Sequence, residues 1–211
     1  MTELRLYDNP RAPSPRRVRI FLAEKGIEVA KTIVDLSTGE HFSDEFRALN
    51  PDCTVPTLVL PDGRAVTDSY AICCYFEAIQ PDPPLMGRDP AERALVEAWA
   101  RRIEIEGYQA AAHVLRHTHP AFEGRSIPGV LEGFPQIPAL ADQARTRFDR
   151  LLTRVDQALT DRPFVACDAF TVADIMLLVA LDFGRRRIEP TLTPRIQRWY
   201  DAVSSRPSAS A

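Results

Sequence analysis

The sequence has few glycines, few cysteines and no long apolar run. Its 211 residues include nine glycines and four cysteines, against eighteen prolines. The cysteines (53, 73, 74 and 167) show neither the spacing of a disulfide framework nor a Cys-x-x-Cys motif. We therefore expect reduced thiols in a cytoplasmic protein.

The sequence also lacks a large excess of charge of either sign, because it contains 26 Lys and Arg and 29 Asp and Glu, for a net charge of -3. This balance argues against nucleic acid or an anionic membrane as the main partner. The most apolar stretch, residues 172–181, contains Asp174 and is too short to span a bilayer. The first five residues carry charge where a signal peptide needs an apolar run, so secretion is not expected either.

The prolines at 81, 83 and 84 interrupt the chain and predict a linker over residues 81–87. Before it, residues 1–80 alternate between strand-like and helix-like patterns in the order βαβαββα, which predicts a small α/β domain. The expected strands are 4–7, 32–35, 57–60 and 65–67, and the expected helices are 15–25, 44–49 and 70–78.

After the linker, residues 88–211 show helical periodicity throughout, which predicts an all-α helical bundle domain. The expected helices are 90–117, 138–160, 172–183 and 193–204, with an irregular Pro- and Gly-rich segment over 120–138. The length and the 45% apolar content suit a core that needs no disulfide or metal.

Three short segments of the first domain suggest a binding site. A cis bond between Val55 and Pro56 would leave the backbone of Val55 open to pair with a peptide-like ligand, although Pro56 can also simply begin a strand. Asp68 and Ser69 stand at a helix start, where Ser69 can cap and first-turn N–H groups can hold a carboxylate. A plain helix cap explains the same residues.

Ser14 precedes Pro15 at another expected helix start, so Ser14 is predicted to be the N-cap. A hydroxyl at a helix N-terminus can also donate to a thiolate, and together with the helix dipole it lowers the pKa of that thiol. A cap without any chemical role remains the simpler interpretation.

Together these segments resemble the cytosolic glutathione transferases (glutathione S-transferases) of bacterial type. The resemblance covers nearly the whole chain: Leu6-Tyr7, residues 14–20, Glu24-Lys25-Gly26, Asn50-Pro51, residues 55–58, residues 68–72 and residues 170–175. It implies a thioredoxin-like first domain and a helical second domain. In the last segment Thr171 and Asp174 match a capping box, which is a structural motif.

The resemblance also implies site residues. Val55, next to cis Pro56, would pair with the cysteinyl unit of glutathione, and Ser14 would stabilise the thiolate. Asp68 and Ser69 would hold the γ-glutamyl end, and His41 would lie near the glycyl carboxylate. The alternatives to Ser14 in this role are Tyr7 and the backbone alone, with no essential side chain.

The sequence departs from the family pattern at three places. Many bacterial relatives carry Asn in the Pro-x-Pro context of Ser14, and others use Tyr from the first strand. Asp68 stands where relatives carry Glu, a longer side chain. Cys167 stands where relatives commonly carry Gly, so a positive φ there would strain the backbone.

Other candidates lie in the second domain and near Val55. Tyr108, His113 and Arg116 are expected to line a pocket for the second substrate. The alternative for the histidines at 113, 117 and 119 is a metal site, for which spacing supplies no further ligand, so no metal is expected. Cys53, close to Val55, is a weaker candidate for a redox role.

The function implied is a transferase that conjugates the glutathione thiolate to a hydrophobic electrophile, in a detoxification role. Glutathione would be the co-substrate, and the protein would be a cytoplasmic homodimer without nucleic-acid or membrane partners. The alternatives are a glutathione-dependent disulfide reductase or peroxidase, and a non-catalytic protein that binds glutathione conjugates.

Overall fold

The computed structural model describes residues 3–211, which divide into two compact units. The first unit ends at Pro83 and also takes in Pro128–Val130 and Ala211. The second contains Pro84–Ile127 and Leu131–Ser210. Each unit is built around its own apolar core.

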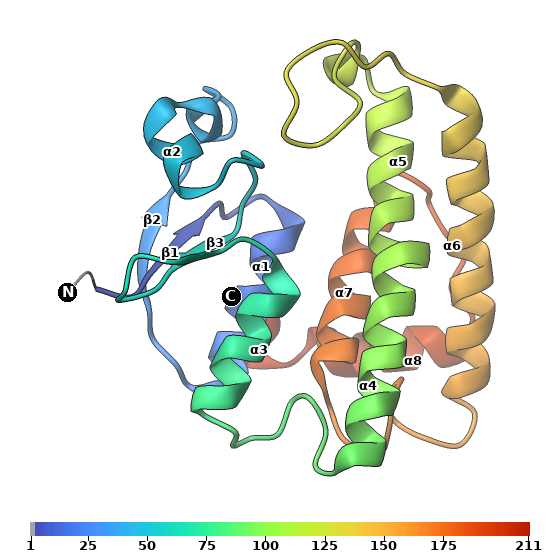
Figure 1. Cartoon of the computed structure of the whole chain (residues 1–211). Helices are drawn as coiled ribbons and strands as arrows, with labels where there is room; N and C mark the ends of the chain where they lie inside the picture. Colours follow the sequence, from blue (N-terminus) through green and yellow to red (C-terminus); the bar gives the residue numbers. More distant parts are fainter. Residues whose placement is uncertain (1–2) are drawn as a thin grey trace. The chain divides into compact units, whose positions relative to one another are not determined.

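The first unit holds a four-stranded mixed sheet in the order β2-β1-β3-β4 (Figure 1). β1 runs parallel to β2, and β3 runs antiparallel to both β1 and β4. The strands are β1 (Arg5–Asp8), β2 (Ala30–Ile33), β3 (Thr57–Val59) and β4 (Ala65–Val66). The helices are α1 (Pro13–Lys25), α2 (Asp44–Leu49) and α3 (Ser69–Ile79), with a short 3-10 turn η1 (Glu40–Phe42). The expected order βαβαββα is confirmed.

α1 and α3 lie side by side and supply most of the large buried side chains of this unit (Figure 1). Phe21 of α1, Phe76 of α3 and Leu58 of β3 are fully buried. At the far ends of these helices the side chain of Lys25 is also fully buried, where it pairs with Glu77 at 2.7 Å and donates to the carbonyl of Gln80. These contacts hold the C-terminal ends of α1 and α3 together, at the opposite end of the two helices from their first turns.

Both helices begin earlier than the sequence patterns indicated. The N-cap of α1 is Ala12, which makes no side-chain cap, so Ser14 lies inside the first turn instead of capping it. The N-cap of α3 is Asp68, not Ser69. Pro13 accounts for the first difference, since proline is favoured at the first helical position. Asp68 takes the N-cap position instead of Ser69 because its carboxylate accepts hydrogen bonds from two backbone N–H groups of the first turn.

The second unit is helical. Its elements are α4 (Pro90–Arg102), the π-helical segment η2 (Ile103–Tyr108), α5 (Gln109–Thr118), η3 (Pro120–Phe122), α6 (Pro138–Ala158), α7 (Val172–Arg185), α8 (Pro194–Ser204) and η4 (Pro207–Ser210). The expected uninterrupted helix over 90–117 is therefore corrected: a π segment separates α4 from α5. Within this segment Gly107 packs closely on α6 and α7, since a Cβ there would lie 2.8 Å from Leu151 Cδ2 and 3.2 Å from Ala180 Cβ.

The start of α7 shows the expected capping box. The carboxylate of Asp174 accepts from the N–H of Thr171 at 3.1 Å, and also from Val165 N–H and the indole N–H of Trp199, both at 3.0 Å. α7 is buried along most of its length, as its continuous apolar sequence predicted.

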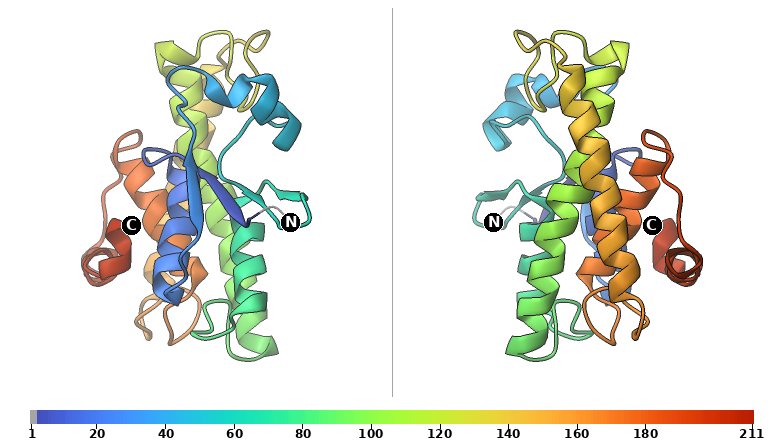
Figure 2. Two further views of the ribbon diagram at one scale, coloured as in Figure 1. Left: turned by 90° about the vertical axis from the view of Figure 1, so that its left-hand side faces the viewer. Right: turned by 90° about the vertical axis from the view of Figure 1, so that its right-hand side faces the viewer.

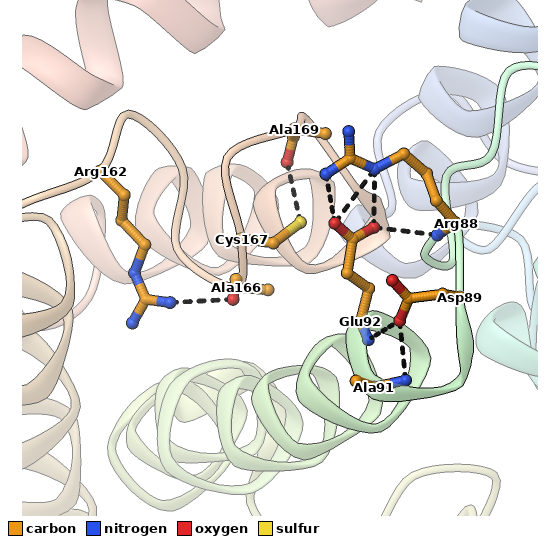
Figure 3. A network of polar contacts seen from close by, with 8 residues as sticks. All are labelled: Arg88, Asp89, Ala91, Glu92, Arg162, Ala166, Cys167 and Ala169. Carbon is orange, nitrogen blue, oxygen red and sulfur yellow. Dashed lines mark hydrogen bonds and ion pairs between the residues drawn. The ribbon is translucent and has the colours of Figure 1, made fainter.

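The loop between α6 and α7 packs near the start of α4, where a polar network surrounds Cys167 (Figure 3). Arg88 forms a forked ion pair with Glu92, and the Sγ of Cys167 lies 3.5 Å from the carbonyl of Ala169. Among the described residues, only Cys53 and Glu189 combine a side chain with a positive φ. The strain considered for Cys167 is therefore absent, and the left-handed residue is Cys53, with φ 51°.

Candidate functional site

The first turns of α1 and α3 meet through two serines. The hydroxyl of Ser14 donates to the Oγ of Ser69 at 3.2 Å, and the buried guanidinium of Arg17 lies 3.5 Å from the same oxygen. Ser69 is only 3% exposed. Because each helix N-terminus carries partial positive charge and free N–H groups, two such ends joined in this way favour an anionic ligand.

Asp68 lies at the edge of this arrangement. Its Oδ1 accepts hydrogen bonds from the N–H groups of Tyr70 and Ala71, both at 2.9 Å. Asp68 itself is exposed. Its carboxylate therefore caps α3 and at the same time presents negative charge to solvent, where an ammonium group can approach.

The loop before β3 presents a free backbone. The peptide bond from Val55 to Pro56 is cis, as predicted. Neither the N–H nor the C=O of Val55 has a hydrogen-bond partner among residues 3–211. Val55 is half-buried and immediately precedes β3 at Thr57, so its unpaired groups are available to an extended ligand.

Asn50 holds this loop in shape. Its side chain is fully buried, and its Nδ2 donates to the carbonyl of Thr54 at 2.8 Å and to the Oγ1 of Thr57 at 3.1 Å. Its Oδ1 accepts from the N–H of Asp52 at 3.0 Å. Asn50 was not among the predicted site residues, although an Asn-Pro pair just before a strand was the available signal.

Three other sequence candidates flank the loop. Cys53 is 3% exposed, and its Sγ lies 3.6 Å from the carbonyl of Pro51. His41 stands in η1, with its ring centroid 4.0 Å from that of Phe42.

Tyr7 packs its ring edge-on against Phe46 of α2, with the ring centroids 6.0 Å apart. The neighbouring Asp8 pairs with Arg19 of α1 at 2.7 Å. Since successive strand residues point to opposite faces, Tyr7 points away from the α1 side. The structure thus joins Ser14 with Ser69 and does not place Tyr7 on the same face of the sheet as α1.

The second unit contains the other candidates. Tyr108 ends the π segment, and its ring lies 5.6 Å from that of Phe183 on α7. Arg116 of α5 stacks on Phe122 at 4.7 Å and donates to the carbonyl of Arg125. Burial lowers the pKa of Arg116, Tyr108 acts in the opposite direction and Arg125 adds to the lowering, so these side chains are within electrostatic reach.

His113 faces a different neighbour. Its ring lies 5.8 Å from that of His117, and burial, His117 and Arg147 of α6 together lower its pKa. His113 therefore lies toward α6, whereas Arg116 lies toward the loop that carries Phe122.

Comparison with known proteins identifies the family. Residues 12–79 match the model described as the glutathione S-transferase N-terminal domain, and residues 111–207 match the glutathione S-transferase C-terminal domain. Glutathione S-transferase 2 of Saccharomyces cerevisiae is 31% identical over 96% of this chain and 86% of its own length. This chain belongs to the glutathione S-transferase family.

Solved structures agree with this assignment. A glutathione S-transferase domain-containing protein of Marinobacter aquaeolei superimposes with a TM-score of 0.87 at 31% identity, over 97% of this chain and 98% of the other. A glutathione S-transferase of Methylobacillus flagellatus, solved with glutathione bound, has a TM-score of 0.80 at 26% identity over 99% of both chains. The thioredoxin-like first domain and the helical second domain of this glutathione S-transferase are thus confirmed.

The histidines of the second domain form loop contacts. His117 accepts at Nδ1 from the N–H of Ile137 at 3.1 Å, and His119 accepts at Nδ1 from the N–H of Ala121 at 3.2 Å. Within residues 3–211, no three His, Cys, Asp or Glu side chains gather in a way that would hold a metal ion. In the same range, no helix has the length and apolar character needed to cross a membrane.

Proposed function

We propose that this glutathione S-transferase binds glutathione in its first domain and transfers the thiolate to a hydrophobic electrophile. The observation that carries the proposal is the hydrogen bond between Ser14 and Ser69, which joins the N-terminal turns of α1 and α3. The bound glutathione of the Methylobacillus flagellatus relative supports glutathione as the ligand.

Each part of glutathione has a matching group. The free N–H and C=O of Val55, beside cis Pro56, would pair with the cysteinyl backbone. The γ-glutamyl carboxylate would lie on the first turn of α3 near Ser69, and its ammonium group would approach the exposed Asp68. His41 would meet the glycyl carboxylate.

In the reaction, the thiol releases its proton to solvent, and the thiolate forms a C–S bond as the leaving group departs with its electron pair. A donor held at a helix N-terminus stabilises the thiolate more than the neutral thiol, which lowers the pKa of the thiol. Ser14 would be this donor, after turning its hydroxyl from Ser69 to the sulfur. Holding both reactants together would supply a further part of the rate.

For the second substrate we propose contacts with Tyr108, His113 and Arg116 in the helical domain. We further propose a cytoplasmic homodimer with two-fold symmetry, which light scattering can test by giving the mass of two chains.

The central test is the thiol pKa of bound glutathione in the wild type and in Ser14→Ala, measured from thiolate absorbance. We expect the pKa to rise by about one unit and kcat/KM for an aryl halide to fall about tenfold, equivalent to about 1.4 kcal/mol. Ser37→Ala, an exposed serine whose contacts are with Asp35, serves as the control.

An unchanged thiol pKa would remove Ser14 from the mechanism. Full glutathione binding without turnover of an electrophile panel would favour a non-catalytic binding protein. Turnover of hydroxyethyl disulfide or peroxides in place of aryl halides would instead favour a reductase or peroxidase.

The role of Asp68 is tested with Asp68→Asn, because Asn keeps the capping oxygen and removes only the charge. We expect glutathione affinity measured by calorimetry to fall about tenfold, as when one charge-assisted hydrogen bond is lost. Wild-type affinity in this variant would contradict the contact with the ammonium group.

A further inference from the structure

A cavity of about 520 Å³ opens in the second unit beside α4 and α6. We call it the arginine groove. Figure 2 shows these two helices facing the viewer in its right-hand view. The groove is lined by Trp99 and Arg102 from α4, Arg154, Gln157 and Ala158 from α6, and Arg162 just beyond α6. It shares no residue with the proposed glutathione site.

The helix packing explains why the groove exists. α5 and the π segment pack along α6, whereas α4 packs on α7. At Gly107 the π segment lies close to α6, because a Cβ there would lie 2.8 Å from Leu151 Cδ2. The two helices that line the groove, α4 and α6, are therefore each held by packing on other helices. A π segment at such a place is often associated with a functional site.

The charges of the groove are poorly compensated. Arg102 stacks on the ring of Trp99 at 4.8 Å and has no carboxylate partner among residues 3–211. Among residues 3–211, Arg162 donates to the carbonyl of Ala158 at 2.9 Å and to no carboxylate. It also donates to the carbonyl of Ala166 at 3.0 Å (Figure 3).

The third arginine has only a loose partner. The Nε of Arg154 lies 3.9 Å from Glu106 Oε2, too far for a hydrogen bond. All three arginines are half-buried. Three guanidinium groups therefore share one cavity with a single distant carboxylate, on a chain whose net charge is -3.

We propose that the arginine groove binds a small organic or inorganic oxyanion that carries at least two negatively charged groups, carboxylate or phosphate. Guanidinium groups are planar donors that match the paired oxygens of these groups. The groove is largely open to solvent and more polar than apolar, which suits a charged ligand better than an apolar one. A multivalent anion would compensate the unpaired charges, and the half-buried setting would strengthen each contact.

The test uses citrate and pyrophosphate as probes, titrated by calorimetry into the intact protein. Sodium chloride at matched ionic strength and sodium acetate control for screening and for a single carboxylate. We expect saturable binding of at least one probe at one site per chain. A preference for citrate or for pyrophosphate then distinguishes a carboxylate ligand from a phosphate ligand.

Arg102→Met and Arg154→Met remove one charge each while keeping an apolar stem of similar size. We expect each to weaken binding about tenfold or more, as for loss of a charge-assisted contact. Arg101→Met is the matched control, because Arg101 is exposed on the same helix and does not line the groove. It should bind as the wild type does.

The proposal is overturned if neither probe saturates at matched ionic strength, or if Arg101→Met weakens binding as much as Arg102→Met. It is also overturned if the groove variants change only the oligomeric state measured by light scattering, since the groove would then be an interface between copies of this chain. Because none of these measurements uses glutathione, failure of the proposed transferase function would leave the outcome intact.

Discussion

At the scale of single residues, Asn50 shows how one amide can prepare a binding edge. The hydrogen bonds of its side chain lie within residues 50–57, and they tie Asp52, Thr54 and Thr57 together. Val55, inside this loop, is left with an unpaired backbone. The side chain of Asn50 therefore positions the groups that we assign to glutathione without touching the ligand itself.

We predict that Asn50→Ala lowers the free energy of unfolding by about 1 to 3 kcal/mol, because the fully buried Asn50 side chain is removed and the carbonyl of Thr54 and the N–H of Asp52 each lose a hydrogen bond. Glutathione affinity should fall as well, since the loop is no longer held in one shape. Urea denaturation and calorimetry measure the two effects. A loss of stability with wild-type affinity would show that Asn50 does not position Val55.

At the scale of elements, the junction of α4 and α5 depends on Gly107. α6 and α7 approach the π segment from two sides through Leu151 and Ala180. A side chain at this position would require the neighbouring side chains to shift, because a Cβ would lie 2.8 Å from Leu151 Cδ2 and 3.2 Å from Ala180 Cβ.

Gly107→Val is predicted to lower the free energy of unfolding by about 1 to 3 kcal/mol, the usual cost of overpacking a well-filled core. Thermal or urea denaturation gives the value. Ile105→Val is the control in the same segment, because Ile105 is 43% exposed and should change stability by less than about 0.5 kcal/mol. Equal effects of the two substitutions would contradict the packing argument.

At the scale of the whole molecule, buried ionisable groups of the helical unit act in opposite directions. Burial lowers the pKa of His113 and His117. Burial raises the pKa of Asp174 to about 6, although several donors favour its charged form. As the pH falls, these histidines bind a proton less readily in the folded protein than in the unfolded chain. Asp174 binds a proton more readily in the folded protein than in the unfolded chain.

The sign of each contribution follows from proton linkage. A histidine with a lowered pKa binds fewer protons folded than unfolded, so its contribution to stability is lost as the pH falls below about 6.5. The raised pKa of Asp174 has the opposite effect as the pH falls through about 6. The two effects overlap, so the wild-type profile alone does not separate them.

A comparison with His113→Gln isolates one histidine, because Asp174 contributes equally to both proteins. We predict that the stability of the wild type relative to this variant is constant above about pH 6.5 and declines below it. The slope should stay well below the ~1.4 kcal/mol per pH unit of one full proton, because water screens a partly exposed ring. Urea denaturation at several pH values measures this, and a pH-independent difference would contradict the lowered pKa.

The sequence alone determined the order of elements, the two domain types and the capping box of Thr171 and Asp174, while the cis bond before Pro56 was implied by the family resemblance. The first three follow from hydrophobic period, proline geometry and side chains that bond within a few residues of themselves. Such properties depend on local chemistry, so they can be read along the chain.

Only the tertiary structure decided which groups meet. The bond from Ser14 to Ser69 joins residues 55 positions apart, and the contact of Tyr7 with Phe46 depends on how α2 folds over the sheet. The left-handed backbone of Cys53, the π segment at Gly107 and the convergence of Arg102 with Arg154 likewise arise from packing between distant segments. Long-range packing can override local preference, and it is packing that brings separated side chains into one site.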